Sequence, residues 1–206
     1  MRTSLLLSAV LMGCSGSSYQ YAGHDVYKYY PLDGERAWEY ATADEDWQLE
    51  VNKVTPTTMV DDVEVVTLEY SVKEPYVLLY GVDWSSSSSD GVMIHGYQVE
   101  ETAESLTFET PIRFAKHEMV SGEENVTETD GYSFTSSFLS VETCYNHWTT
   151  DDWQCLHFEV TEDSGAEFPF LGEYWIATRW GASAILSPGY ENEWILTQGS
   201  YGSGEE

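Results

Sequence analysis

The chain has 206 residues, enough for one ordinary domain, and its hydrophobic content of 42% is sufficient to build a core. Acidic residues outnumber basic ones by 36 to 8, which gives a formal net charge of -28. A surface of that sign repels phosphate groups, so we exclude nucleic acid as a partner. It also repels anionic lipid headgroups, so any attachment to a membrane must be covalent.

The first thirteen residues predict an export signal. Arg2 is followed by an apolar run from Leu5 to Leu11, which is too short to span a bilayer as a helix. The run Leu11-Met12-Gly13-Cys14 resembles the lipobox of bacterial lipoproteins; the alternative is an ordinary cleavage site with an incidental cysteine. The resemblance implies cleavage after Gly13 and a lipid anchor on Cys14. Ser15 stands where an Asp would retain an enterobacterial lipoprotein in the inner membrane, so we expect a lipid-anchored protein of the outer membrane.

After a flexible tether over residues 14–28, residues 29–199 form the predicted domain, in which apolar and polar residues alternate with a period of two. The run from Val63 to Lys73 changes phase between Val65 and Val66, which predicts a β-bulge or a bend. Ser85 to Ser89 predict a loop tip, and residues 200–206 a disordered tail. The fold class is therefore all-β, a single antiparallel β domain built as a barrel-like sheet or a sandwich. The clearest alternating runs are Trp47 to Val51, Leu106 to Glu109 and Leu156 to Thr161.

Two cysteines remain after Cys14. In an exported protein, Cys144 and Cys155 are first interpreted as a disulfide that closes the neck of a hairpin. The alternative is a zinc site that adds His147 and His157, but the spacing differs from that of zinc fingers, whose paired cysteines lie about two to four residues apart. We predict the disulfide, and neither a metal site nor a cofactor.

Aromatic motifs near both ends of the domain carry a family resemblance. Tyr29-Tyr30-Pro31-Leu32-Asp33-Gly34 precedes Trp38 and Tyr40, and Gly172-Glu173-Tyr174-Trp175, Trp180-Gly181 and Trp194-Ile195-Leu196 stand near the end. In these motifs the chain resembles a group of uncharacterised bacterial lipoproteins of the myxobacterial type. The resemblance implies localisation and fold, and no activity. We expect the first and last strands, which hold Trp38 and Trp194, to pack or pair with each other.

Aromatic residues make up 15% of the chain, with 8 Trp and 15 Tyr. The simpler interpretation places these rings in the core; the alternative is an exposed platform or an interior pocket for a glycan or a lipid. The ligand-binding candidates are Tyr76, Tyr80, Trp84, Trp148 and Trp153.

Catalytic motifs are missing from the sequence. It contains no Gly-x-Ser-x-Gly elbow, no His-Glu-x-x-His pair and no Ser-x-x-Lys, so we predict a protein without enzymatic activity. The carboxylate clusters suit weak binding of divalent cations, although none has the spacing of a calcium loop. These clusters are Asp44-Glu45-Asp46, Asp61-Asp62 and Asp151-Asp152.

The sequence thus predicts an envelope lipoprotein with a binding or scaffolding domain, whose partner is a glycan, a lipid or an envelope protein. The first alternative is a carrier of an apolar ligand or glycan in a β-sheet pocket, and the second is a hydrolase. An apolar cavity of several hundred cubic ångströms would favour the carrier. Titratable groups that converge in a cleft would favour the hydrolase.

Overall fold

The computed structural model describes residues 24–26, 30, 32, 36–42, 48–73, 76–146, 151–177, 181–186 and 194–201. Strands dominate this part of the chain, as the period-two pattern predicted. Within it no helix combines the length and the apolar character needed to cross a membrane. The strands are β1 (His24–Asp25), β2 (Arg36–Ala41), β3 (Gln48–Lys53), β4 (Thr58–Val60), β5 (Val63–Val72), β6 (Val77–Ser87), β7 (Gly91–Val99), β8 (Glu104–Ala115), β9 (Glu118–Met119), β10 (Glu124–Thr129), β11 (Tyr132–Asn146), β12 (Asp151–Glu162), β13 (Gly172–Ala177), β14 (Gly181–Leu186) and β15 (Trp194–Tyr201).

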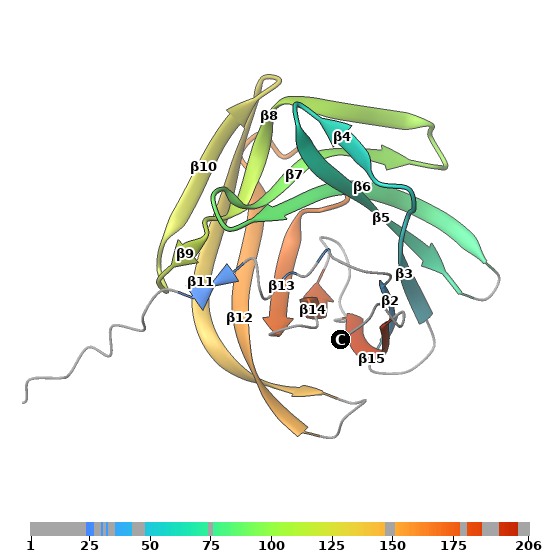
Figure 1. The fold of residues 1–206 in the computed structure, drawn as a ribbon, viewed down its shortest axis with the longest axis vertical. Helices are drawn as coiled ribbons and strands as arrows, with labels where there is room; N and C mark the ends of the chain where they lie inside the picture. Colours follow the sequence, from blue (N-terminus) through green and yellow to red (C-terminus); the bar gives the residue numbers. More distant parts are fainter. Residues whose placement is uncertain are drawn as a thin grey trace, which may run out of the picture.

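One continuous antiparallel sheet contains all the described strands except β1 and β9, which pair with each other. Its order is β10-β11-β12-β13-β14-β15-β2-β3-β5-β6-β7-β8, with β4 paired to β5. The sheet curls until its first and last strands lie against each other, so two halves of one folded sheet face each other in a sandwich-like arrangement (Figure 1). The predicted all-β, single-domain fold is confirmed.

The first and last long strands pair as expected. β2 and β15 form an antiparallel ladder in which Leu196 stands opposite Tyr40. Trp38 and Tyr40 share one face of β2, and both are buried, as is Leu196. The ladder joins the two ends of the domain, since it links a strand that begins at residue 36 to one that ends at residue 201.

The core is aromatic. All seven phenylalanines of the chain are buried. The Phe114 ring on β8 lies 5.2 Å from Phe158 on β12, 5.3 Å from Tyr174 on β13 and 5.5 Å from Trp84 on β6. Because these strands belong to different halves of the sheet, the ring contacts hold the two halves together.

The two ends of the sheet, β8 and β10, meet through side chains. The hydroxyl of Thr129 accepts a hydrogen bond from the Thr110 amide at 3.0 Å, and the hydroxyl of Thr127 accepts one from the Arg113 amide at 3.2 Å. Both threonines are buried, while Val126, which directly precedes Thr127, is 62% exposed. The usual pattern of apolar residues inside is reversed on β10, because its inner face supplies hydrogen-bond acceptors to the β8 backbone.

Several predicted boundaries and details change. β1 and the buried Val26 lie inside the predicted tether, and the Val26 amide donates to the His117 carbonyl at 3.0 Å. β15 runs to Tyr201, two residues into the predicted tail. The predicted loop tip over Ser85 to Ser89 is shorter than expected, since β6 continues to Ser87 and the turn covers residues 88–90. The phase change at Val65 coincides with a change of partner, because β4 pairs with β5 up to that residue and β6 pairs from the next one. The lipobox and Cys14 lie outside the described residues.

The predicted pairing of Cys144 with Cys155 agrees with the structure. Their Cα atoms lie 5.9 Å apart, within the range of a disulfide, and the two sulfurs are bonded. Cys144 stands opposite Trp153 in the β11–β12 ladder and Cys155 opposite Glu142, so the bond crosses the hairpin diagonally. The zinc alternative is thereby set aside, since both thiols are used.

Candidate ligand-binding cleft

A cavity of about 1030 Å³ opens at one end of the folded sheet. Antiparallel pairing brings to this end the starts of β3, β6 and β13 and the ends of β7, β12 and β14. The connection between β12 and β13 forms one wall. The lining residues are Leu49, Leu79, Tyr80, Val99, Glu159, Val160, Thr161, Glu162, Gly165, Ala166, Glu167, Phe168, Pro169, Leu171, Gly172, Glu173 and Leu186.

The lining combines apolar side chains with carboxylates. Of the described residues that line the cleft, ten are apolar, four are glutamates and none is basic. Leu49 on β3, Leu79 and Tyr80 on β6 and Val99 on β7 present their side chains from one half of the sheet. Clefts with a mainly apolar lining and a few polar groups are the usual binding sites for small molecules, and about 300–1000 Å³ is their usual volume.

The wall formed by residues 163–171 is fixed from both sides. Phe168 and Phe170 are buried, and each ring lies within 6.5 Å of the rings of Tyr97, Phe108 and Phe134. At the start of the wall, the Glu162 carboxylate accepts hydrogen bonds from the amide and hydroxyl of Ser164 and from the Ala166 amide, at 2.8–3.0 Å. Desolvation would raise the pKa of Glu162, but these hydrogen bonds outweigh it and hold the pKa below its ordinary value. The cleft therefore has a preformed wall.

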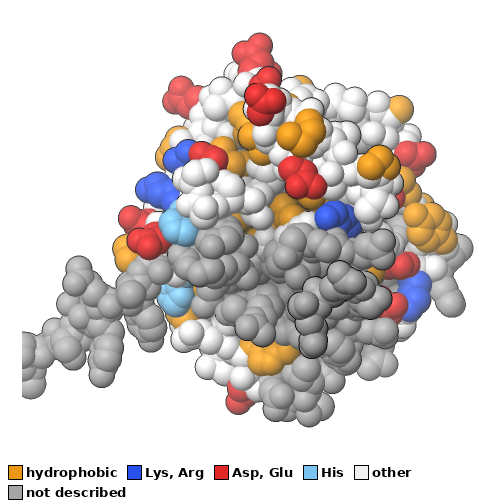
Figure 2. Space-filling model, in the orientation of Figure 1, with side chains coloured by type: hydrophobic (Ala, Val, Ile, Leu, Met, Phe, Trp, Pro, Cys, Tyr) orange, Lys and Arg blue, Asp and Glu red, His pale blue; other side chains and the backbone are white. Residues whose placement is uncertain are grey.

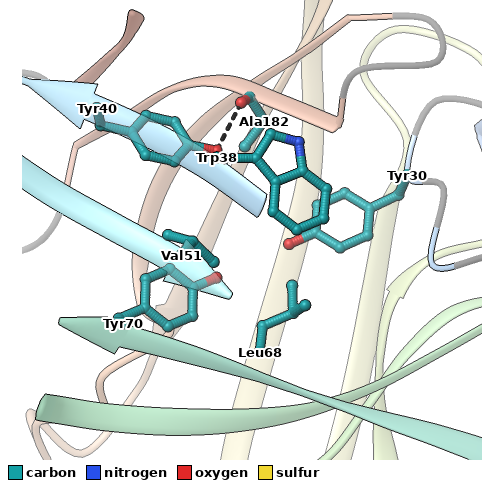
Figure 3. Close-up of a pocket in the computed structure, with 7 residues that line it drawn as sticks. All are labelled: Tyr30, Trp38, Tyr40, Val51, Leu68, Tyr70 and Ala182. Carbon is teal, nitrogen blue, oxygen red and sulfur yellow. Dashed lines mark hydrogen bonds between the residues drawn. The ribbon is translucent and has the colours of Figure 1, made fainter. Parts of the chain in front are cut away.

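A second, much smaller cavity lies in the core. It measures about 10 Å³, room for about one water molecule, and is closed by tyrosine rings (Figure 3). The Tyr40 hydroxyl donates to the Ala182 carbonyl at 2.8 Å (Figure 3). Burial raises the pKa of Tyr40 well above its usual range and that of Tyr70 to about 12. This small cavity is a packing feature of buried tyrosines, so the larger cleft is the candidate site for a ligand.

A histidine between two carboxylates lies beside the cleft on β12. His157 Nδ1 is 3.1 Å from Glu142 Oε1 and its Nε2 is 2.7 Å from Glu173 Oε2, while the Trp175 ring stacks on the imidazole at 4.3 Å. A hydrogen bond from Ser140, then the one from His157, lowers the pKa of Glu142. Each ring nitrogen of His157 thus faces a carboxylate oxygen on a neighbouring strand. Glu173 belongs both to this cluster and to the cleft lining.

The structure also contains a buried serine–histidine contact. Ser85 Oγ and His95 Nε2 lie 2.7 Å apart, and the Thr67 hydroxyl donates to nearby Asp83. Burial lowers the pKa of His95, and the Asp83 charge opposes this effect. The residue types suit nucleophilic catalysis, but Ser85 and His95 are only 5% and 6% exposed and do not line the cleft. The Ser85 hydroxyl therefore serves as the hydrogen-bond partner of the buried His95 imidazole.

The four described aromatics among the predicted ligand-binding residues do not come together. Tyr80 lines the cleft and stacks on Tyr70 at 4.6 Å. Tyr76 is 63% exposed, Trp84 is completely buried, and Trp153 is half-buried on β12. Trp148 lies outside the described residues. The apolar residues of the cleft were missed because they come from separate strand ends. Its wall carried a visible signal in the apolar run Phe168-Pro169-Phe170-Leu171.

Of the predicted carboxylate clusters, one forms a hairpin turn and another lies outside the described residues. Asp61 and Asp62 both adopt positive φ, 49° and 65°, at the two-residue turn between β4 and β5, which is the geometry of a tight hairpin. Residues 44–46 are not described. In the described part of the chain, no group of three or more His, Cys, Asp or Glu side chains is arranged to hold a metal ion.

Comparisons with known proteins add one distant likeness. No family model matches the chain. No curated protein matches it either. One solved structure, a protein of Parabacteroides distasonis ATCC 8503 provisionally described as a lipoprotein, has a TM-score of 0.43 and 10% identity over 86% of this chain and 100% of its own. A likeness at this level transfers no property to this chain.

Proposed function

We propose that this protein is a lipid-anchored protein of the bacterial envelope whose β domain binds an apolar ligand in the cleft, without catalysis. The lipobox-like run at Cys14 supports the anchor, and Ser15 supports the outer membrane. The observation that carries the binding function is the cleft of about 1030 Å³ with ten apolar lining residues. Its volume meets the criterion that favours a ligand carrier over a pure scaffold.

The lining favours an apolar ligand over a glycan. Sugar rings are held by exposed aromatic faces and by many polar side chains, whereas aliphatic and proline side chains dominate this cleft. The described lining residues include no serine, cysteine or histidine, so the cleft offers no nucleophile–base pair of the Ser–His or Cys–His kind, and this supports a binding role.

The binding function is tested on the protein purified from its own envelope, by native mass spectrometry. We expect an apolar molecule to co-purify with the natural chain and to be lost from Val99→Trp, which fills the cleft. The matched control is Val126→Trp, the same replacement on the exposed face of β10. A natural chain without ligand, or equal occupancy of Val99→Trp, would contradict the proposal.

The anchor is tested separately with Cys14→Ser. We expect the natural chain to sediment with outer membranes and the variant to lose both its lipid mass and signal cleavage. A natural chain that carries no acyl mass would refute the anchor and leave the binding function untouched.

A further inference from the structure

The inner face of the sheet carries a row of apolar side chains that runs across four strands. Its members are successive direct partners in the antiparallel ladders: Tyr40 on β2, Leu49 on β3, Val72 on β5 and Val77 on β6. Direct partners present their side chains on the same face of a sheet. Tyr40 and Leu49 are each 3% exposed and belong to the core, so the whole row faces the interior. We call these four residues the mouth row.

Burial decreases along the mouth row. Tyr40 and Leu49 are buried, Val72 is partly exposed, and Val77 is 48% exposed. Among the described residues, the core cluster takes in neither Val72 nor Val77. Tyr76, which precedes Val77, is 63% exposed. Figure 2 shows hydrophobic side chains at the surface on the side of the molecule where β5 ends and β6 begins. The protein therefore leaves the β6 end of an inward-facing apolar row partly uncovered.

The mouth row is continuous with the cleft. Leu49 belongs to both, and Leu79 and Tyr80 line the cleft directly after the start of β6. The β5–β6 register shifts by one residue at Leu79, which has no direct partner on β5. Because of this shift, Tyr80 and Val77 share the inner face although they are three residues apart. A ligand in the cleft can therefore extend along one apolar face to the surface.

The length of this apolar face indicates the length of the ligand. Neighbouring strands lie about 4.8 Å apart, so the row runs about 10 Å from Leu49 on β3 across β5 to Val77 on β6. A compact cavity of about 1030 Å³ is itself about 10 Å across. With carbon–carbon bonds of about 1.5 Å, an extended chain of eight carbons is about 10 Å long and one of sixteen carbons about 20 Å. The shorter chain fits the cleft alone, whereas the longer one also covers the mouth row.

We propose, building on the binding function above, that the ligand of the cleft is a long linear hydrocarbon chain that continues out of the cleft over Val72 and Val77. Its apolar end lies in the cleft against Leu49 and Tyr80, and its polar end lies at the surface beside Tyr76. A compact ring system that fills the cleft would leave Val77 in water. Covering the exposed end of the row buries further apolar area, which selects long chains over short ones and over compact molecules.

The test uses the full lipid-anchored chain in nanodiscs of zwitterionic lipid and measures how fast a maleimide labels the thiol of the Val77→Cys variant. Val77 is half-exposed at the start of a strand, so this replacement preserves the fold. The probes are hexadecan-1-ol and octan-1-ol, which share an uncharged head and differ in length. At about tenfold above its Kd a probe occupies about nine-tenths of the sites, so hexadecan-1-ol should slow labelling about tenfold. Octan-1-ol, which fits inside the cleft, should leave the rate unchanged.

The matched control is Val126→Cys, because Val126 is a strand valine that is 62% exposed on β10 and does not line the cleft. Both alcohols should leave its labelling rate unchanged. Adding Val99→Trp to Val77→Cys fills the cleft and should remove the protection by hexadecan-1-ol. Native mass spectrometry of the same samples reports whether each alcohol is bound.

The outcomes separate the two proposals. If Val99→Trp abolishes the binding of hexadecan-1-ol but the alcohol does not protect Val77→Cys, the binding function stands and the path over the mouth row is refuted. If octan-1-ol protects Val77→Cys as well as hexadecan-1-ol does, the preference for a long chain is overturned. Equal protection of Val126→Cys would likewise overturn the path, since the effect would belong to the whole surface. If neither alcohol binds, or if Val99→Trp changes neither, the binding function itself fails.

Discussion

The contact between β8 and β10 leads to the most direct prediction about the fold. Replacing Thr127 and Thr129 with Val keeps the shape of both side chains but removes the oxygens that accept from the Arg113 and Thr110 amides. A lost hydrogen bond of this kind costs about 1–1.5 kcal/mol when the stranded amide is only partly covered. The two residues lie on one face of β10, so we expect the double variant to lose about 2–3 kcal/mol, allowing for some coupling.

The measurement is urea unfolding followed by tryptophan fluorescence. We expect the free energy of unfolding to fall by about 2–3 kcal/mol while its slope against urea concentration stays unchanged. In thermal unfolding the same loss corresponds to a fall in the midpoint temperature of about 4–12 °C for a domain of this size. The control is Thr127→Ser with Thr129→Ser, which keeps both oxygens and should retain most of the stability. If the Val variant is as stable as the natural chain, or the Ser variant is as unstable as the Val variant, side-chain hydrogen bonds do not close the sheet.

Four further predictions concern the core, the disulfide, a turn and pH. Phe170→Ala should cost about 3–5 kcal/mol in urea unfolding, because the ring is 1% exposed and packs against other rings, whereas Phe170→Leu should cost less than about 1.5 kcal/mol. Reduction of the bond between Cys144 and Cys155, separated by 11 residues, should lower the unfolding free energy by about 3 kcal/mol, measured with and without reductant. Gly91→Ala should reduce the yield of folded protein severely, because φ is +84° and a Cβ would lie 2.0 Å from the Ala115 carbonyl oxygen. Burial lowers the pKa of His95 below 6.5, so as the pH falls the unfolded chain binds a proton at this histidine before the folded chain does. The free energy of unfolding should therefore decline below about pH 6.5. His95→Gln removes this proton site and should make the decline between about pH 7.5 and 5.5 smaller.

The strand pattern was predictable because it depends on local alternation. Leu156, Phe158 and Val160 are all buried on one face of β12, as the period of two requires. Pairing of the two terminal strands was also predictable, since Trp38 and Tyr40 present an apolar face that must be covered. The bond between Cys144 and Cys155 was predictable because these are the two cysteines left after Cys14 in a chain with an expected export signal.

The departures have physical causes that a single strand does not reveal. β10 buries threonines and exposes Val126 because its neighbour, β8, offers amides in place of an apolar surface. Pro111 inside β8 was a signal of an edge strand, since proline cannot donate to a ladder. His157 is buried on the outer face because Glu142 and Glu173 stand on the flanking strands, and that requires knowledge of the register. The cleft draws on seven segments of the chain, so no local pattern encodes it.

The small β1–β9 pair lies at the opposite end of the domain from the cleft. β8 starts at the cleft end and runs 12 residues before the chain reaches β9, so β1 is held about 40 Å away, at the opposite pole of the domain. Ten residues separate Cys14 from His24, a leash of about 35 Å at full extension. With acyl chains on Cys14, the bilayer would hold the pole that carries β1, and the mouth of the cleft would point outward. Such a geometry suits a receptor that exchanges its cargo with the aqueous compartment or a facing protein, and it disfavours direct extraction of lipid from the supporting leaflet.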